Sequence, residues 1–583
     1  MIAQRLALCL LLALPAFAAD RKDPILGAME DELDRSRLLR TMPLAQPYYF
    51  EYAIHDGDHI DISATLGALV GAHDVRFHIP EITVRAGDTQ FDSTNYAGGD
   101  THAGSGYGIY AFPLDDSYRV LRRDLWLTTD SAYKQALELL SLKRAALRDV
   151  TLNEDLPDFD SAAPLQRIAG ARIHPFDQAG WTERVRRLSA LFRGYPAVRY
   201  SSVTFDGGQG LFYLATSEGA RIRVSETSVQ LRVNADAQAP DGMMLHDAVF
   251  FPSLDADGVP PDAELERGVR EVAANLTALA AAPTGAEYSG PVLFEGVAAG
   301  QLFAQVLGAN LAAPRRPVTP PGLSLPVRTS ELENRIGSRI LPEWMDVVDD
   351  PTQSEWRGRP LFGHYDVDLE GVAAQRVSLV EKGVLKNFLL TRQPVNTFRA
   401  SNGHARLPGS FGEKRAGIGN LFVSASGGVS PAELRKRLID LCRERNMPYG
   451  ILIRKMDFPS TAPGGELRRL FAGMAQSGGA AHPVSLPVLV YRVYLDGHEQ
   501  LVRGLRLRGL NARSLKDIEA ASNEPAAFDY YDNGKPFAAV GAGSYAAESS
   551  VIAPSVLIDD VELERIEEEL PKLPIVPAPA LLQ

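Results

Sequence analysis

The sequence predicts an α+β fold, with strand-and-helix domains in its amino-terminal part followed by a β-rich carboxy-terminal domain. Groups of strand-like segments come before single helical segments, instead of alternating with them one by one. That order is typical of antiparallel sheets with segregated helices and argues against a doubly wound parallel sheet. The chain has 583 residues, 45% of them hydrophobic, which suffices for two to four domains with large cores.

The first residues predict a secretory signal peptide. Arg5 precedes an apolar run from Leu6 to Leu14, and Pro15 then leads into the small-residue stretch Ala16-Phe17-Ala18. We expect cleavage near Ala18, so residues 1–18 form the signal peptide and the mature protein is periplasmic or secreted. The apolar run is well below the roughly 20 residues that span a bilayer, so no integral membrane anchor is expected.

Cysteine content argues against a disulfide-stabilised protein, and net charge argues against a nucleic-acid-binding protein. Cys9 leaves with the signal peptide, so Cys442 has no intrachain partner and no disulfide framework is expected. Cys442 itself is expected to be an ordinary buried thiol in a helix. The net charge of −13 argues against nucleic-acid binding, because such surfaces usually carry a basic patch.

Residues 19–195 predict an amino-terminal α+β domain. Its first helix is expected from Pro24 to Thr41, with Asp23 as N-cap and Pro24 at the first helical position. Antiparallel strands then follow at residues 48–54, 59–64 and 75–79, joined by turns at Asp56-Gly57-Asp58 and Gly71-Ala72. Two more helices are expected, at residues 124–147 and 182–192, with Thr182 as the cap of the second.

Residues 196–283 predict a central domain made of a β-meander and one helix. Strand-like segments repeat with turn residues between them, at residues 200–205, 210–216, 220–225 and 229–233. Pro260-Pro261 then opens a helix whose apolar positions run from Leu265 to Leu279. Pro283 and Gly285 indicate a linker into the carboxy-terminal domain, residues 284–583.

The carboxy-terminal domain contains six motifs that occur in a fixed order. They are Gly290–Phe303, Met345–Pro351, Asp368–Arg376, Gly383–Arg392, Ser401–Arg406 and Ser549–Leu557. Together they resemble the TldD/PmbA (TldE) family of zinc-dependent peptidases. The resemblance covers the mature chain loosely and residues 290–557 closely, and it implies a heterodimer in which a TldD-type subunit binds zinc and a PmbA-type subunit does not.

The resemblance places the family's zinc-binding His-Glu-x-x-x-His motif on Phe294 to Ala299. Phe294 stands at the first histidine, Glu295 at the general base and Ala299 at the second histidine. A later cysteine ligand is expected between Tyr531 and Gly543, where this sequence has none. Because Phe and Ala cannot bind zinc, all three ligand positions are degenerate, and no metal or other cofactor is expected in this chain.

Glu295 has two interpretations. It is either a remnant of the general base or a carboxylate at the start of a helix opened by Gly290-Pro291, where it would complement the helix dipole. The resemblance also places the loop Ser401–Arg406 near the substrate cleft. Asn402, His404 and Arg406 are therefore the expected contacts to a peptide or partner, while a loop that only holds its own backbone is the alternative.

Two other patterns are weaker. His55 and His59 flank Asp56-Gly57-Asp58 and offer metal ligands, although a hairpin turn accounts for the same residues. Gly541–Ala546 has the glycine spacing of a dinucleotide loop but lacks the βαβ context, so we interpret it as an ordinary loop.

Three hypotheses remain open. The first is an exported, non-catalytic PmbA-type subunit that binds extended peptides by strand addition and assists a zinc-bearing TldD-type partner, or pairs with itself. The second is an active peptidase with an unconventional site that includes Glu295 and His404. The third is a binding or scaffold protein of the cell envelope without a proteolytic partner.

Overall fold

The structure, a computed structural model, describes most of the chain. The described ranges are residues 23–39, 45–98, 112–148, 156–170, 173–323, 329–408, 413–476, 483–532, 546–567, 569–576 and 579–580. The expected signal peptide and most of the loop Gly541–Ala546 lie outside these ranges. None of the helices in the described ranges is long and apolar enough to cross a membrane.

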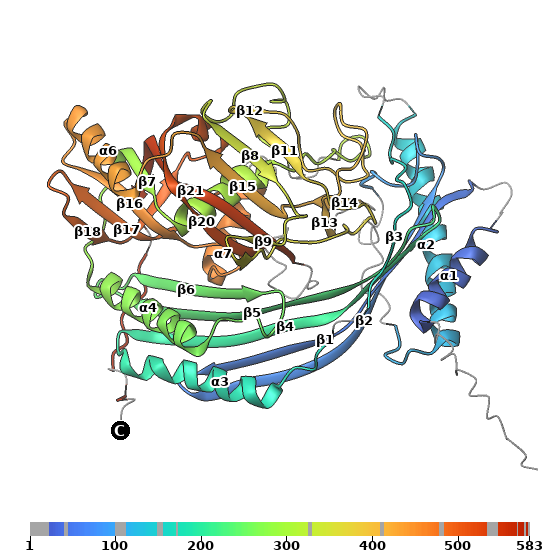
Figure 1. The fold of residues 1–583 in the computed structure, drawn as a ribbon, viewed down its shortest axis with the longest axis horizontal. Coiled ribbons are helices and arrows are strands. Elements are labelled where there is room, and N and C mark those ends of the chain that lie inside the picture. Colours follow the sequence, from blue (N-terminus) through green and yellow to red (C-terminus); the bar gives the residue numbers. More distant parts are fainter. Residues whose placement is uncertain are drawn as a thin grey trace, which may run out of the picture.

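The first sheet has six strands in the order β2-β1-β4-β5-β3, and β6 pairs with the same edge of β5 as β3, further along the strand. Four of its strands are unusually long, and the sheet curves along them (Figure 1). The strands are β1 (Pro47–Thr65), β2 (Ala68–Ala86), β3 (Gln166–Ile168), β4 (Val198–Thr216), β5 (Arg221–Gln238) and β6 (Met244–Ser253).

The turns expected at Asp56-Gly57-Asp58 and Gly71-Ala72 are wrong, because both lie inside long strands. Gly57 and Gly210 face each other across β1 and β4. A Cβ added at Gly57 would lie 2.5 Å from the Gln209 carbonyl oxygen, so glycine here permits a close backbone approach within the sheet. The actual β1–β2 turn is at Leu66-Gly67, where both residues have positive φ.

The expected boundary at residues 195/196 does not separate two sheets. Strands β1 and β4 are paired along their length, from Glu51 opposite Thr216 to Ala64 opposite Val203. Strand β4 in turn pairs with β5. Residues from both expected domains therefore form a single sheet with a shared core. The alternation of residues within each block was visible in the sequence, but the pairing between the blocks was not.

Four helices cover the convex face of this sheet (Figure 1). They are α1 (Pro24–Ser36), α2 (Tyr118–Ala146), α3 (Gln178–Ala190) and α4 (Asp262–Ala281). The cap of α1 is confirmed, because Asp23 Oδ1 accepts from the backbone N–H groups of Ile25 and Leu26. In α3 the cap is Asp177 instead of Thr182, whose hydroxyl bonds the carbonyl of Gln178 inside the helix.

The second sheet has eleven strands and forms the carboxy-terminal part, which confirms the α+β class and the β-rich carboxy-terminal domain. Its order is β12-β11-β8-β15-β21-β7-β16-β17-β18, and β19 and β20 also pair with β21. Its strands are β7 (Tyr288–Phe294), β8 (Met345–Asp349), β11 (Val377–Glu381), β12 (Val384–Leu385), β15 (Asn420–Ala425), β16 (Tyr449–Met456), β17 (Pro487–Tyr494), β18 (Glu499–Val502), β19 (Leu505–Arg508), β20 (Ile518–Asp532) and β21 (Ala547–Arg565).

The remaining helices and short strands lie in the carboxy-terminal part, apart from one 3-10 turn that directly follows α3. They are α5 (Val297–Leu302), α6 (Pro431–Glu444), α7 (Gly464–Gln476), η2 (Leu191–Gly194), η3 (Phe303–Leu307), η4 (Gly308–Asn310), η5 (Ala512–Asp517) and the small strands β9 (Glu355–Trp356), β10 (Arg359–Pro360), β13 (Ala405–Pro408) and β14 (Lys414–Ala416). As expected, Cys442 is a buried free thiol in helix α6. Burial raises its pKa to about 11, so it is protonated at neutral pH.

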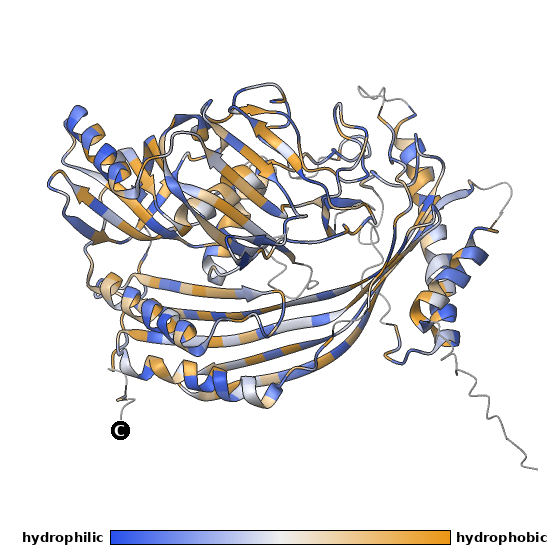
Figure 2. Cartoon of the chain, viewed as in Figure 1, coloured by the Kyte–Doolittle hydropathy of each residue, from blue (hydrophilic) through white to orange (hydrophobic). Residues whose placement is uncertain are grey.

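The concave face of the first sheet is turned toward the carboxy-terminal sheet (Figure 1). Figure 2 shows apolar and polar residues alternating along its long strands. The apolar residues of the convex face pack against α3 and α4, with Ile60, Phe205 and Leu231 all fully buried. The polar residues of the opposite face are therefore left for contacts with the carboxy-terminal part.

Candidate functional site

The stretch that carries the family motif forms a strand, a short turn and a helix. Gly290 and Pro291 lie inside β7, so the helix expected to open there is wrong, and α5 begins only at Val297. The apolar run Val292–Phe294 pairs with β16 on one side and β21 on the other, which buries it as a central strand. Glu295 and Gly296 form the connection, where Gly296 has a φ of 59°.

The two positions assigned to zinc-binding histidines lie in the hydrophobic core. Phe294 and Ala299 are both fully buried and belong to one apolar cluster. Helix α5 packs closely on β20, because a Cβ added at Gly300 would lie 2.6 Å from Cβ of Phe528. Phe528 is in turn surrounded by the rings of Phe458 and Tyr530, at centroid distances of 5.0 and 5.4 Å.

This environment does not fit zinc. Neither Phe294 nor Ala299 offers a donor atom, and aliphatic and aromatic groups surround both. The segment expected to hold the third ligand contains no cysteine, and only its first two residues, Tyr531 and Asp532, are described. No hydrolytic step through a metal can be built on these residues.

Glu295 belongs to an ion-pair cluster that joins three elements. Its Oε1 accepts from Arg435 Nη2 at 2.7 Å, and its Oε2 accepts from Arg454 Nε at 3.0 Å. The same two arginines reach Glu499 at 3.8 and 2.8 Å. Both carboxylate oxygens are thus engaged by guanidinium groups from α6 and β16, which supports a structural role for Glu295.

The loop with Asn402, His404 and Arg406 is largely internal. His404 is fully buried, with Nε2 at 3.2 Å from Asp349 Oδ1 and Nδ1 at 2.8 Å from the Asn402 carbonyl oxygen. The Asn402 side chain bonds the backbone of Leu390 and Phe388. The polar atoms of His404 and Asn402 therefore bond the chain itself in this structure, and a contact from either residue to a peptide or partner stays a prediction.

Arg406 lies close to the boundary between the two sheets. Its Nη2 donates to the Glu548 carbonyl oxygen at 2.8 Å, and its guanidinium lies 4.1 Å from the ring centroid of Tyr365. Its side chain keeps 12% of its surface exposed. A contact from Arg406 to a peptide or partner stays a prediction.

A buried charge network joins the two parts of the chain; its residues Glu370 and Arg392 lie in two of the six motifs, but the sequence did not show that they meet. Arg392 is 1% exposed, and its Nη2 donates to Glu218 Oε2 and to the Asp160 carbonyl oxygen, both at 2.6 Å. The guanidinium also lies 4.0 Å from the ring centroid of Phe159. Beside it, Glu370 Oε2 accepts from the Arg392 backbone N–H at 2.7 Å. Arg392 therefore ties the carboxy-terminal part to the first sheet and to the segment before it.

Glu370 makes the stability of this junction depend on pH. Burial and the negative charge of Asp368 raise the pKa of Glu370 to about 8, against about 4.3 in an unfolded chain. Because the folded pKa is the higher one, the stabilising contribution is complete below pH 4 and is lost as the pH rises through 8. We expect Glu370→Gln, which stays neutral, to gain about 1–3 kcal/mol over the natural protein between pH 5 and pH 8.

Urea unfolding at pH 5, 6, 7 and 8 measures this difference. The exposed Glu444→Gln at the end of α6 is the matched control and is expected to run parallel to the natural protein. A constant difference between Glu370→Gln and the natural protein across this range would contradict the assignment.

The concave face of the first sheet carries partly exposed polar groups. His59 on β1 lies 3.4 Å from Asp206 on β4, and Gln230 on β5 donates to the same carboxylate at 3.0 Å. The hydrogen bond to Asp206 raises the pKa of His59, although partial burial opposes it. Burial and the charge of Asp206 also raise the pKa of Asp61. These groups come together through the pairing of long strands, which explains why the sequence did not reveal them.

His55 and His59 do not form a shared metal site. They lie four positions apart along one strand, which corresponds to about 13 Å. Each instead pairs with a carboxylate on another strand, His55 Nδ1 with Glu226 at 2.7 Å and His59 with Asp206.

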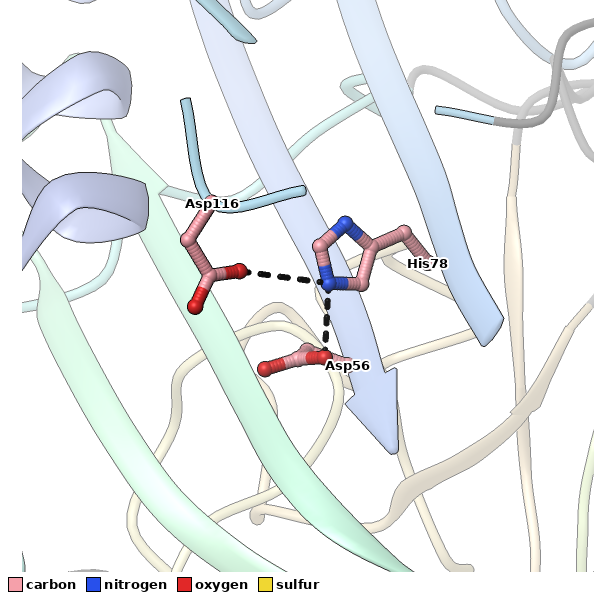
Figure 3. A group of neighbouring side chains, drawn as sticks. All are labelled: Asp56, His78 and Asp116. Atoms are coloured by element: carbon pink, nitrogen blue, oxygen red, sulfur yellow. Dashed lines mark ion pairs between the residues drawn. The ribbon is translucent and has the colours of Figure 1, made fainter. Parts of the chain in front are cut away.

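A second group, on the convex side, does gather three ligand-type atoms. Figure 3 shows the carboxylates of Asp56 and Asp116 pointing at the same ring nitrogen of His78, at 2.7 and 3.6 Å. Arg76 also pairs with Asp56, and its Nη2 lies 3.4 Å from the same nitrogen. The guanidinium thus already supplies positive charge where a metal would sit. We assign this group to an ion-pair cluster.

Comparisons with known proteins agree with this architecture. Residues 287–485 match the model of the PmbA/TldA metallopeptidase C-terminal domain. A metalloprotease of Methanothermobacter thermautotrophicus is 30% identical over 30% of this chain and 36% of its own length, and one of Archaeoglobus fulgidus is 36% identical over 13% of this chain and 17% of its own. The matched stretches therefore span well under half of these relatives. The crystal structure of TldE from Thermococcus kodakarensis has the same fold, with a TM-score of 0.54, 14% identity and coverage of 92% of this chain and 100% of that one.

Proposed function

Because the chain belongs to the TldD/PmbA family, we propose that it is the non-catalytic, PmbA-type subunit of an exported peptidase, which binds extended peptides and assists hydrolysis by a zinc-bearing TldD-type partner. The family relationship gives the class of protein, related to metallopeptidases. The subunit role, the partner and the export are the proposal.

The observation that carries the proposal is the packing at the zinc-ligand positions. Phe294 and Ala299 are fully buried among apolar side chains, and the acid between them is held by Arg435 and Arg454. Restoring a zinc site would require donor atoms and an open coordination position. In this chain apolar side chains occupy the positions of the zinc ligands, so we place the hydrolytic chemistry on another subunit.

The concave face is the surface that we assign to peptide binding. The carboxylates and amides of Asp61, Asp206 and Gln230 lie on it together with His59, partly exposed and turned toward the carboxy-terminal part. Polar groups on a rigid sheet suit recognition of an extended chain, which presents its own donors and acceptors. The signal-like residues 1–18 support the export part of the proposal.

Elemental analysis of the purified chain tests its non-catalytic nature. We expect less than about 0.1 zinc per chain after equilibration with one equivalent of zinc and gel filtration, because neither Phe294 nor Ala299 has a donor atom and, among the residues that the structure describes, apolar side chains pack around both. A protein purified from the native host with its partner is expected to contain zinc. Stoichiometric zinc in the isolated chain that disappears on Glu295→Gln would overturn the proposal.

A further inference from the structure

A positively charged groove lies between α1 and the beginning of α2, on the side of the first sheet away from the carboxy-terminal part. It has a volume of about 500 Å³ and is lined by Glu32, Arg35, Tyr118, Arg119, Arg122, Arg123 and Trp126. Four arginines and one carboxylate, Glu32, thus line the groove, and Asp31 lies beside it, although the whole chain has a net charge of −13. The groove is therefore locally basic on an acidic protein.

Only part of this charge is balanced within the groove. Arg35 Nε donates to Glu32 Oε1 at 2.7 Å, and Arg122 Nη2 lies 3.6 Å from Glu32 Oε2. The Tyr118 hydroxyl bonds Asp31 nearby and accepts from Arg122 at 3.2 Å. Within the described part of the chain, Arg119 and Arg123 form no ion pair.

The arginines also stand at the unfavourable end of their helix. The first turn of α2 contains no acidic residue, and Ser117 gives no capping hydrogen bond from its side chain. The positive end of the helix dipole therefore adds to the charge of Arg119, Arg122 and Arg123. The acids just before the helix are Asp115 and Asp116, and Asp116 is directed toward His78. Basic residues in a first helical turn cost stability, and such exceptions are typical of functional surfaces.

The exposed side of the helix combines this charge with apolar surface. Arg119, Arg122, Arg123 and Trp126 follow helical spacing and share one side of α2. Trp126 is 43% exposed, and Val120 and Leu127 nearby are 40% and 50% exposed. The stripe from Arg119 to Trp126 is about 10 Å long, which matches a few residues of peptide.

We propose that this groove binds a short acidic segment of another polypeptide, with two or more carboxylates next to an apolar side chain. The guanidinium groups of Arg119 and Arg123 would pair with the carboxylates, and Trp126 would cover the apolar residue. The short reach of the stripe and the strong net negative charge of the chain disfavour a long polyanion such as a nucleic acid. The surface is separate from Glu295 and from the concave face, so this proposal stands without the proposed function.

Fluorescence anisotropy with labelled peptides tests it on the full mature chain. The probe is an eight-residue peptide of glutamates around one leucine, and the reference peptide has glutamine in place of each glutamate. We expect binding of the acidic peptide that weakens as salt rises from 50 to 300 mM, and at least about tenfold weaker binding of the glutamine peptide.

Matched variants localise the site. Arg119→Glu/Arg123→Glu is expected to weaken binding at least about tenfold. Lys436→Glu/Arg437→Glu on α6 makes the same change in net charge and is expected to leave binding within about twofold of the natural protein. Both double variants replace side chains with substantial exposure, and circular dichroism checks that they fold.

Three results would overturn the proposal. They are equal binding of the acidic and glutamine peptides, equal loss of binding in both double variants, and binding only to vesicles with anionic lipid and not to the peptide. Trp126→Ala adds an independent check, since it leaves the charge unchanged and is expected to weaken binding of the leucine-containing peptide more than that of an all-glutamate peptide.

Discussion

Replacing Arg392 by methionine is expected to lower the free energy of unfolding by about 3–5 kcal/mol. The methionine keeps most of the aliphatic volume but removes the positive charge and the bonds to Glu218 and to the Asp160 carbonyl oxygen. Glu218 and the Asp160 carbonyl oxygen then face an apolar side chain without the guanidinium that donated to them, while Glu370 keeps its bond to the backbone N–H of residue 392. The cost comes mainly from these uncompensated groups, because removing one partner of a buried pair leaves the other desolvated.

Urea unfolding at pH 7 measures this loss. Arg376→Met is the matched control, because the Arg376 side chain is 60% exposed and lies 3.8 Å from Asp350. That change is expected to cost less than about 1 kcal/mol. Equal stability of the two variants would show that the junction between the sheets does not depend on Arg392.

Adding the zinc-bearing TldD-type partner to this chain is expected to raise hydrolysis of an unfolded peptide by at least about 100-fold over this chain alone. The physical reason is the lack of metal ligands here, since neither Phe294 nor Ala299 can hold a zinc ion that activates water. The rate is followed with an internally quenched peptide, and complex formation is followed by size-exclusion chromatography.

Metal removal provides the control for that experiment. A chelator is expected to abolish hydrolysis by the mixture and added zinc to restore it, while neither changes the behaviour of this chain alone. Full activity of this chain in the absence of a partner, at a level equal to the mixture, would contradict a non-catalytic role.

Local signals in the sequence were sufficient for the fold class and for the starts of α1 and α4. Asp23 and Pro24 fixed the start of α1, because a capping carboxylate and a proline at the first helical position act within one turn. Pro261 similarly precedes α4. These features depend only on neighbouring residues and were therefore predictable.

The long strands were not predictable in the same way. Asp56-Gly57-Asp58 has the composition of a turn, and only the facing Gly210 on β4 shows that Gly57 serves a close contact between strands. The residue opposite a glycine is set by tertiary pairing, 153 positions away in this case, and no local pattern encodes it. For the same reason, the sequence analysis assigned β1 and β2 to one domain and β4 and β5 to another, although β1 pairs with β4.

The candidate site was predictable in its chemistry but not in its geometry. The sequence alone shows that Phe294 and Ala299 cannot bind zinc. It does not show that Arg435 and Arg454 hold Glu295, since these residues lie 140 and 159 positions away. The resemblance placed the loop of His404 near a substrate cleft, but the sequence did not show that the ring is buried with Nε2 at 3.2 Å from Asp349 Oδ1, 55 positions away.

The most direct measurement of the central claim is kcat/KM of the complex between the TldD-type partner and the Glu295→Gln variant of this chain. Glutamine keeps the shape and one acceptor oxygen for Arg435 and Arg454, so assembly is expected to persist. We predict a kcat/KM within about twofold of the natural complex, because a structural carboxylate takes no part in proton transfer. A general base contributes about 10²–10⁴ to the rate, so a loss of at least about 100-fold with assembly intact would contradict the account.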